Sequence, residues 1–182
     1  IINNPNKLIK QMQKWSEHEN LHVRRLSSEG IRPRLPWAMQ LPELIKDPKP
    51  IFPILDNLKD DPEVYVRKSV ANNLNDISKD HPTKVLDWSK SNYNKSDLTN
   101  AVIKHALRTL LKSAHSEAIQ LFGYSDINNF EIRDLKLETP IVKLNEELIF
   151  SFKIKNRSKN EEMLRLEYGI SFLKQNSKQN RK

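Results

Sequence analysis

The first two thirds of the chain carry apolar residues at helical spacing. In the stretch 61–82, "DPEVYVRKSVANNLNDISKDHP", apolar residues recur at every third or fourth position and form one stripe. The stripe consists of Val66, Val70, Leu74 and Ile77, and the polar side carries Lys68, Asn72, Asn75, Asp76 and Lys79. Asp61 and Pro62 are typical of a helix start, and Pro82 is typical of a helix end. The pattern predicts one long helix here.

Further helices are predicted on both sides of this one, separated by prolines. They cover residues 7–15, 20–29, 42–45, 51–58 and 101–111. Gly30 directly follows one of them and is a suitable C-cap. We therefore expect the chain to be helical from about residue 4 to residue 122.

Three of the predicted helices begin in the same way, with an apolar residue followed by a basic one. The pairs are Val23-Arg24, Val66-Arg67 and Ile103-Lys104, at spacings of 43 and 37 residues. This is the period of helical-pair repeats of the HEAT kind, which stack into a curved solenoid. The second helix of each pair would line the concave face, so these basic residues would recur along one surface. A solvated helix face explains any single arginine better, but three in register favour a shared basic groove.

The pattern changes near Tyr124 to alternation with a period of two. Apolar and polar residues alternate over 148–155 and over 164–172, which predicts two strands. The segment 130–142 predicts one or two more, around Pro140. A β-sandwich normally has about seven strands, so we expect this β-domain to be incomplete.

The predicted fold class is mainly α. We expect a HEAT-like α-solenoid over residues 1–123, followed by a small, incomplete β-sandwich over residues 127–182, which the family resemblance given below implies to be immunoglobulin-like. The chain begins at Ile1, within what reads as a segment already under way. We therefore expect a fragment whose solenoid is incomplete at its N-terminal end.

The amino-acid composition limits which binding partners and which kinds of chemical site are possible. The 182 residues include 31 Lys and Arg against 23 Asp and Glu, a net charge of +8, which suits nucleic acid or an anionic surface but requires neither. The absence of cysteine excludes disulfides and thiolate metal sites. His81, His105 and His115 lack the close spacing of metal ligands, and three glycines supply no phosphate loop. We expect no metal, no cofactor and no membrane span.

One short stretch, residues 28–37, concentrates unusual chemistry. It reads "SEGIRPRLPW", and Pro33 and Pro36 keep it from continuing the preceding helix. One ordinary explanation is that Glu29 pairs with a neighbouring arginine and that Trp37 packs in the core. A carboxylate at a helix C-terminus opposes the helix dipole, however, so a further interaction should justify Glu29.

A second acid, Asp76, lies on the polar side of the long predicted helix. It can pair with Lys79 or Lys68 as an ordinary solvated acid. Because Glu29 and Asp76 belong to adjacent repeats, however, they can also converge on the concave face. Two acids in a basic groove would repel phosphate, so they suit a target that carries positive charge.

Together these motifs resemble a known family. The segments "HVRRLSSEGIRPRLPWA", "YVRKSVANNLNDISKDHP" and "IKHALRTLLK" are similar to the HEAT-like DNA alkylation repair glycosylases. Within them the chain resembles the AlkC branch, in which an immunoglobulin-like domain follows the solenoid. The similarity covers residues 8–123 well and the β-strands more loosely. It implies a DNA repair glycosylase that, without a metal, hydrolyses the N-glycosidic bond of cationic alkylated bases, such as N3-methylated purines, in double-stranded DNA.

The resemblance also implies roles for single residues. Glu29 and Asp76 would be the active-site acids that stabilise an oxocarbenium-like transition state. Trp37 would lie beside them and hold the cationic lesion or its deoxyribose, and Arg25 would lie in or near the same site. Candidates for phosphate contacts are Arg24, Arg32, Arg34, Arg67, Lys68, Lys104 and Arg108. The lesion would be handled in bent DNA rather than in a deep base-flipping pocket.

The implied partner is double-stranded DNA containing alkylated bases. The resemblance implies neither a membrane nor an obligate protein partner, but a monomer in the bacterial cytoplasm, associated with the nucleoid. A missing N-terminal repeat and an incomplete β-domain would leave such a fragment with little activity. Two other functions stay open: a non-catalytic HEAT-like DNA-binding protein that recognises damaged or branched DNA, and a protein–protein scaffold, which would show no salt-sensitive DNA binding.

Overall fold

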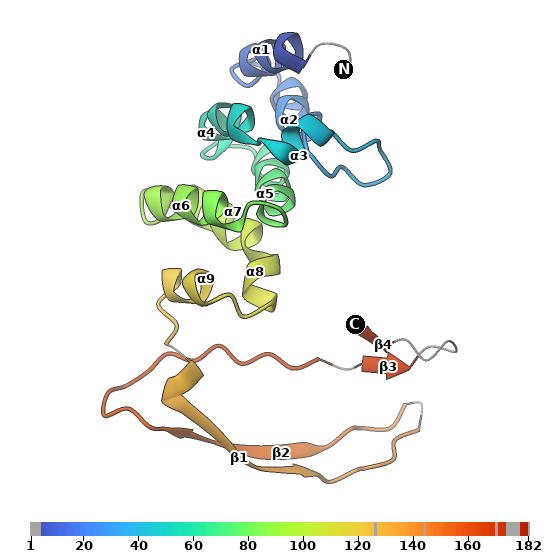
Figure 1. Ribbon diagram of the computed structural model, residues 1–182, viewed down its shortest axis with the longest axis vertical. Helices are drawn as coiled ribbons and strands as arrows, with labels where there is room; N and C mark the ends of the chain where they lie inside the picture. The colour runs from blue at the N-terminus through green and yellow to red at the C-terminus, as the bar shows by residue number, and fades with distance from the viewer. Residues whose placement is uncertain (1–4, 126, 144, 170, 174–178, 182) are drawn as a thin grey trace. The chain divides into compact units, whose positions relative to one another are not determined.

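The computed structural model describes residues 5–125, 127–143, 145–169, 171–173 and 179–181. The chain divides into two compact units, Ile1–Ala118 and Ile119–Lys182. Most of the helices belong to the first unit and all of the described strands to the second (Figure 1). The predicted fold class, mainly α with a following β-domain, is confirmed. The sequence-based domain limits, 1–123 and 127–182, stay a prediction.

The first unit is a stack of short helices. In chain order the helical elements are α1 (Pro5–Trp15), α2 (Leu21–Glu29), α3 (Pro42–Lys46), the 3-10 turn η1 (Lys49–Ile51), α4 (Phe52–Leu58), α5 (Val64–Ser78), α6 (Pro82–Asn92), α7 (Asp97–Ala106), α8 (Arg108–Lys112) and α9 (Ser116–Leu121), which crosses into the second unit. α1 packs on α2, α4 on α5 and α6 on α7. None of the described helices is both long and apolar enough to cross a membrane.

The helices that carry the three apolar-basic pairs, α2, α5 and α7, are the second members of these helix pairs. The first two apolar-basic pairs lie in the first turn of α2 and α5 as predicted, but Ile103-Lys104 lies in the last turn of α7, so the predicted start of that helix is wrong. α5 packs against α2 on one side and against α7 on the other, and Figure 1 shows the pairs following one another down the stack. Val23, Val66 and Ile103 lie on these three helices, as the repeat spacing predicted, and the latter two are fully buried. The polar side chains between α2, α5 and α7 are therefore held at fixed distances by a repeating core.

Apolar side chains between the helices form that core. The predicted stripe of α5, Val66, Val70, Leu74 and Ile77, is buried along its whole length. Burying one such side chain contributes about 1.5–3 kcal/mol. Fully buried neighbours from the other helices are Ile51, Ile54, Leu55, Leu58, Leu86, Ile103 and Leu107.

Two details of the long helix differ from the prediction. α5 begins at Val64, after the N-cap residue Glu63. The predicted cap, Asp61, instead accepts hydrogen bonds from the Arg24 side chain and from the backbone N–H of Glu63. Pro82 does not end α5 but begins α6, because its missing N–H costs nothing in the first turn of a helix.

The proline-rich stretch between α2 and α3 is an ordered loop. Gly30 caps α2, and its N–H donates to the Leu26 carbonyl at 2.8 Å. Ile31 is fully buried, so the loop starts from an anchored position. Further along, the backbone N–H of Leu41 donates to the Pro33 carbonyl at 3.1 Å and closes the loop.

The described residues of the second unit form two antiparallel strand pairs. After the 3-10 turn η2 (Ile127–Asn129), β1 (Phe130–Leu137) pairs with β2 (Phe150–Asn156), and β3 (Ser171–Leu173) pairs with β4 (Gln179–Arg181). Ile132 lies opposite Ile154, and the register shifts between Arg133 and Lys136. β2 confirms the strand predicted over 148–155, and β1 lies within the segment 130–142.

The strand predicted over 164–172 is wrong for most of its length. Residues 164–169 form no strand, residue 170 lies outside the described residues, and β3 starts only at Ser171. Alternation sets the faces of side chains, but a strand also needs a neighbour to take up its backbone hydrogen bonds. In the described part of the chain no strand pairs with residues 164–169.

Candidate active site

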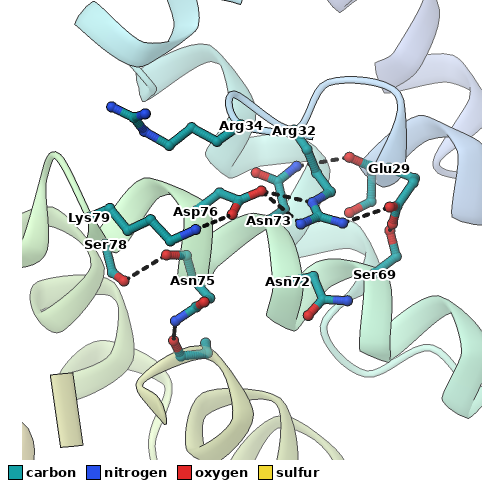
Figure 2. Close-up of polar contacts among 12 residues, drawn as sticks. Glu29, Arg32, Arg34, Ser69, Asn72, Asn73, Asn75, Asp76, Ser78 and Lys79 are labelled. Atoms are coloured by element: carbon teal, nitrogen blue, oxygen red, sulfur yellow. Dashed lines mark hydrogen bonds and ion pairs between the residues drawn. The ribbon is translucent and has the colours of Figure 1, made fainter. Parts of the chain in front are cut away.

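Two acids from neighbouring repeats meet across one arginine. Glu29 is the last residue of α2, Asp76 lies near the end of α5, and Arg32 comes from the loop after α2. Arg32 places Nη1 2.7 Å from Glu29 Oε1, and Nε and Nη2 at 2.9 and 2.8 Å from Asp76 Oδ2 (Figure 2). The convergence of Glu29 and Asp76 expected from their repeats is therefore present. Arg32 is the link between them.

This cluster is largely withdrawn from solvent. Asp76 is 2% exposed and Arg32 is 8% exposed, whereas the Glu29 side chain keeps 17% of its surface in solvent. Charges are buried only when partners and hydrogen bonds compensate for the lost water. Glu29 is thus the more accessible of the two acids, and Asp76 is the more deeply buried.

Three further side chains complete the shell of the two acids. The Ser69 hydroxyl donates to Glu29 Oε2 at 2.8 Å, and Arg25 Nη2 lies 3.6 Å from the same oxygen. Lys79 Nζ donates to the other oxygen of Asp76, Oδ1, at 2.9 Å. The expected pairings of Glu29 with a neighbouring arginine and of Asp76 with Lys79 both occur, but Asp76 is buried and not the solvated acid of the ordinary explanation. With Arg25, Arg32 and Lys79 against two carboxylates, the cluster is rich in cations.

A buried amide fixes α5 to the end of α2 behind the acids. Asn73 Nδ2 donates to the backbone carbonyl of Ser28 at 2.8 Å, and both residues are fully buried. Among the described residues, Asn73 Oδ1 and Ser28 Oγ have no hydrogen-bond partner. The contact holds the residue before Glu29 against the helix that carries Asp76.

On its other side the cluster continues to α7 and α8. Arg108 donates to Asn72 Oδ1 at 3.1 Å and to the His105 carbonyl at 2.8 Å. Burial lowers the pKa of Arg108, although the nearby charge of Asp76 opposes the shift. Burial, and then the charges of Arg108 and Lys68, lower the pKa of His105. A basic region therefore lies directly beside the acids.

Trp37 lies apart from the Arg32 network. It is on the loop that also supplies Arg32 and Arg34, its side chain is fully exposed, and its backbone φ is 62°. That left-handed conformation costs a non-glycine residue roughly 1–2 kcal/mol. Packing of Trp37 in the core, the ordinary explanation of this residue, is excluded.

Several residues predicted to contact phosphate have partners within the protein. Arg24 pairs with Asp61 at 2.6 Å, and Arg67 donates to the Pro62 carbonyl at 2.8 Å. Arg34 forms two hydrogen bonds of 2.7 Å with Asp80 and thereby lowers the pKa of that carboxyl.

Lys68 and Lys104, by contrast, are exposed. In the part of the chain that the structure describes, neither ammonium group donates a hydrogen bond or joins an ion pair. Of the predicted phosphate contacts, these two lysines are therefore the ones that can bind a phosphate without first leaving a partner among the described residues.

Sequence reasoning did not single out Tyr65, Ser69 and Asn73 as part of this site. All three lie on α5, and Tyr65 and Ser69 are spaced by four residues, as are Asn72 and Asp76. Tyr65, Ser69 and Asn73 lie eleven, seven and three residues before Asp76, on the same side of the helix, and this spacing is the signal that could have found them. No group of three or more His, Asp or Glu residues that could hold a metal ion occurs in the described ranges.

Known sequence families match both parts of the chain. The family described as "DNA alkylation repair enzyme" matches residues 1–110, and the one described as "Uncharacterised protein YhaZ, C-terminal Ig-like domain" matches residues 131–182. The uncharacterized protein YhaZ of Bacillus subtilis (strain 168) is 46% identical over 176 residues, which cover 97% of this chain and 49% of that protein.

A solved structure has the same fold. It is the Pseudomonas fluorescens alkylpurine DNA glycosylase AlkC bound to DNA containing an abasic site analog. The TM-score is 0.87 at 38% sequence identity, and the match covers 100% of this chain and 50% of that one. The chain thus spans about half the length of these two relatives.

Proposed function

Because the chain belongs to the DNA alkylation repair enzyme family, we propose that it forms part of a DNA glycosylase. The reaction would be hydrolysis of the N-glycosidic bond of cationic alkylated bases, such as N3-methylated purines, in double-stranded DNA. The observation that carries the proposal is the convergence of Glu29 and Asp76 on Arg32 from separate repeats. The similarity to a glycosylase solved with DNA that contains an abasic site analog supports it further.

The two acids suit this reaction electrostatically. An alkylated base is cationic, and breaking its bond to the sugar builds positive charge on the deoxyribose. A fixed carboxylate next to that charge stabilises the transition state more than the ground state. Glu29, whose side chain is the more exposed of the two acids, would face the sugar and position the attacking water.

Asp76 would act from behind Glu29. It holds Arg32 through two of the guanidinium nitrogens, and Arg32 in turn holds Glu29. The Lys79 side chain, 43% exposed, pairs with the remaining oxygen of Asp76 and would turn toward a phosphate of the bound DNA. That movement would expose Asp76 to the cationic lesion. Arg32 is better explained as the residue that positions both acids than as a phosphate contact.

The other proposed roles follow from exposure. Trp37 is fully exposed and presents its ring to a bound duplex, where it would hold the lesion or its sugar. Lys68 and Lys104 are the first candidates for phosphate contacts. Four arginines would each have to give up a partner within the protein before they could bind a phosphate: Arg24, Arg34, Arg67 and Arg108. The protein is proposed to act as a monomer on alkylated duplex DNA in the bacterial cytoplasm.

The test is release of methylated bases from alkylated duplex DNA by the protein, with Glu29→Gln and Asp76→Asn measured in parallel. Each substitution should lower the rate about 10²- to 10³-fold, the usual cost of removing one group that stabilises transition-state charge. Glu117→Gln is the matched control, because Glu117 is also an ion-paired carboxylate but pairs with Lys90 on the surface. Wild-type rates in both site variants would refute the assigned mechanism.

A second function, non-catalytic recognition of damaged or branched DNA, is favoured by one observation. Both acids are already neutralised by Arg32, Arg25 and Lys79, so the surface around them is a cationic one. Such a protein would bind duplex DNA with a steep dependence on salt and release no base. Tight, salt-sensitive binding together with no detectable base release by the wild type would favour this function over catalysis.

A further inference from the structure

We propose that Tyr65 is a positioning residue, which holds the guanidinium of Arg25 beside Glu29. This role rests on the proposed function, since Glu29 is the acid assigned to the sugar. Arg25 Cζ lies 4.4 Å from the centroid of the Tyr65 ring, while Arg25 Nη2 lies 3.6 Å from Glu29 Oε2. One guanidinium is thus shared between an aromatic face and the carboxylate.

The four side chains form a matched arrangement between two helices. Arg25 and Glu29 are one turn apart on α2, and Tyr65 and Ser69 are one turn apart on α5. Tyr65 contacts Arg25, and the Ser69 hydroxyl donates to Glu29 at 2.8 Å (Figure 2 shows the latter contact). Tyr65, in the first turn of α5, therefore positions the cation Arg25, and Ser69, one turn later, positions the acid Glu29.

His22 supports the ring from the other helix. Its imidazole meets the Tyr65 ring edge-on, with the ring centroids 6.1 Å apart. His22 lies one turn before Arg25 on α2, so both contacts of the tyrosine come from one face of that helix. With α2 and α5 packed together, Tyr65 is held in place and can limit the motion of Arg25.

The site requires that the Arg25 side chain be limited to few conformations. Its side chain is 31% exposed, and its distance from Glu29 is longer than a hydrogen bond, so the ion pair alone fixes it weakly. A flexible arginine loses rotamer entropy when it is ordered. Stacking on Tyr65 reduces the freedom that Arg25 must lose in the transition state, so its effect falls on kcat rather than on binding. The face of the ring performs this role, so Phe should replace Tyr65 and Leu should not.

The first experiment tests the contact without any need for activity. In the ¹⁵N-labelled protein, the Arg25 Nε–Hε resonance, assigned by its loss in Arg25→Lys, should carry a ring-current shift from Tyr65. Tyr65→Phe should keep the shift and Tyr65→Leu should abolish it. An unchanged Arg25 resonance in Tyr65→Leu would overturn the proposal, whether or not the protein releases bases.

The second experiment links the contact to the reaction. Tyr65→Leu should lower kcat for base release about two- to five-fold, the range of an exposed cation–π contact of about 0.5–1 kcal/mol, with the Kd for DNA unchanged. Tyr65→Phe should restore kcat. In an Arg25→Met background, Tyr65→Leu should have no further effect. An equal loss with and without Arg25, or a change in Kd alone, would mean that Tyr65 contacts DNA directly.

These results separate two failures. If the wild type releases no base but the Arg25 resonance responds as expected, the proposed function fails and the positioning contact stands. If base release is normal but neither kcat nor the resonance responds to Tyr65→Leu, the function stands and the role of Tyr65 is refuted.

Discussion

Arg32 allows the carboxylates of Glu29 and Asp76 to lie close together where little water reaches them. Without a cation between them, Glu29 and Asp76 would repel each other and would each need water. A guanidinium suits this position because its planar fork donates to two acids at once. Repeat spacing predicted that the two acids converge, but the sequence suggested Arg32 only as a phosphate contact. Nothing in "EGIRPR" shows that an arginine three residues after the acid turns back under it.

Removal of Arg32 should therefore destabilise the fold. Arg32→Leu leaves Asp76, 2% exposed, without its main partner, and loss of one member of a buried pair typically costs about 3–5 kcal/mol. Urea unfolding followed by tryptophan fluorescence measures this, since Trp15, Trp37 and Trp88 all lie in the helical unit. Arg34→Leu breaks a more exposed pair with Asp80 and should have a much smaller effect. Equal stability losses in the two variants would contradict the buried role of Arg32.

At the scale of elements, α5 is the helix on which the site depends. Its apolar stripe was predicted residue by residue, because burial and the 3.6-residue period leave little freedom. Its start was predicted wrongly: Asp61 accepts the backbone N–H of Glu63 while it pairs with Arg24, and the helix begins only after Glu63, at Val64. Likewise, alternation over 164–172 could not show whether a partner strand exists. Local sequence patterns predict well which face of a helix or strand is buried. Helix caps and strand pairing depend on contacts between segments that are distant in the sequence, so local patterns predict them poorly.

Asn75 joins α5 to the junction of α7 and α8. Its Nδ2 donates to the Ala106 carbonyl at 2.8 Å and to Thr109 Oγ1 at 2.9 Å, and Asn75 is buried. Asn75→Asp keeps the size but removes both donated hydrogen bonds, so it should cost at least about 1–3 kcal/mol of unfolding free energy. Urea unfolding of the variant checks this. A stability equal to that of the wild type would show that the junction does not need this amide.

At the scale of the molecule, a net charge of +8 does not say which cations meet DNA. The structure divides the basic residues into those with an ionic partner within the protein and those without one among the described residues. Arg24 and Arg34 are ion-paired with carboxylates, whereas Lys68 and Lys104 are exposed and have no such partner among the described residues. The sequence gives the register of basic residues along successive helices. It cannot give the pairing, because Asp61 and Asp80 approach those arginines only in the folded chain.

This sorting predicts the salt dependence of DNA binding. A cation that neutralises one phosphate contributes about 0.9 to the slope of log K against log salt. Lys68→Gln and Lys104→Gln should therefore each reduce the slope by about 0.9, as measured by fluorescence anisotropy with a labelled duplex over a range of salt concentrations. Arg34→Gln is the matched control, and it should leave the slope unchanged because Asp80 already holds that guanidinium. If Arg34→Gln reduces the slope as much as Lys68→Gln does, the Arg34–Asp80 pair opens on binding, and pairing in the free protein is not what selects the phosphate contacts.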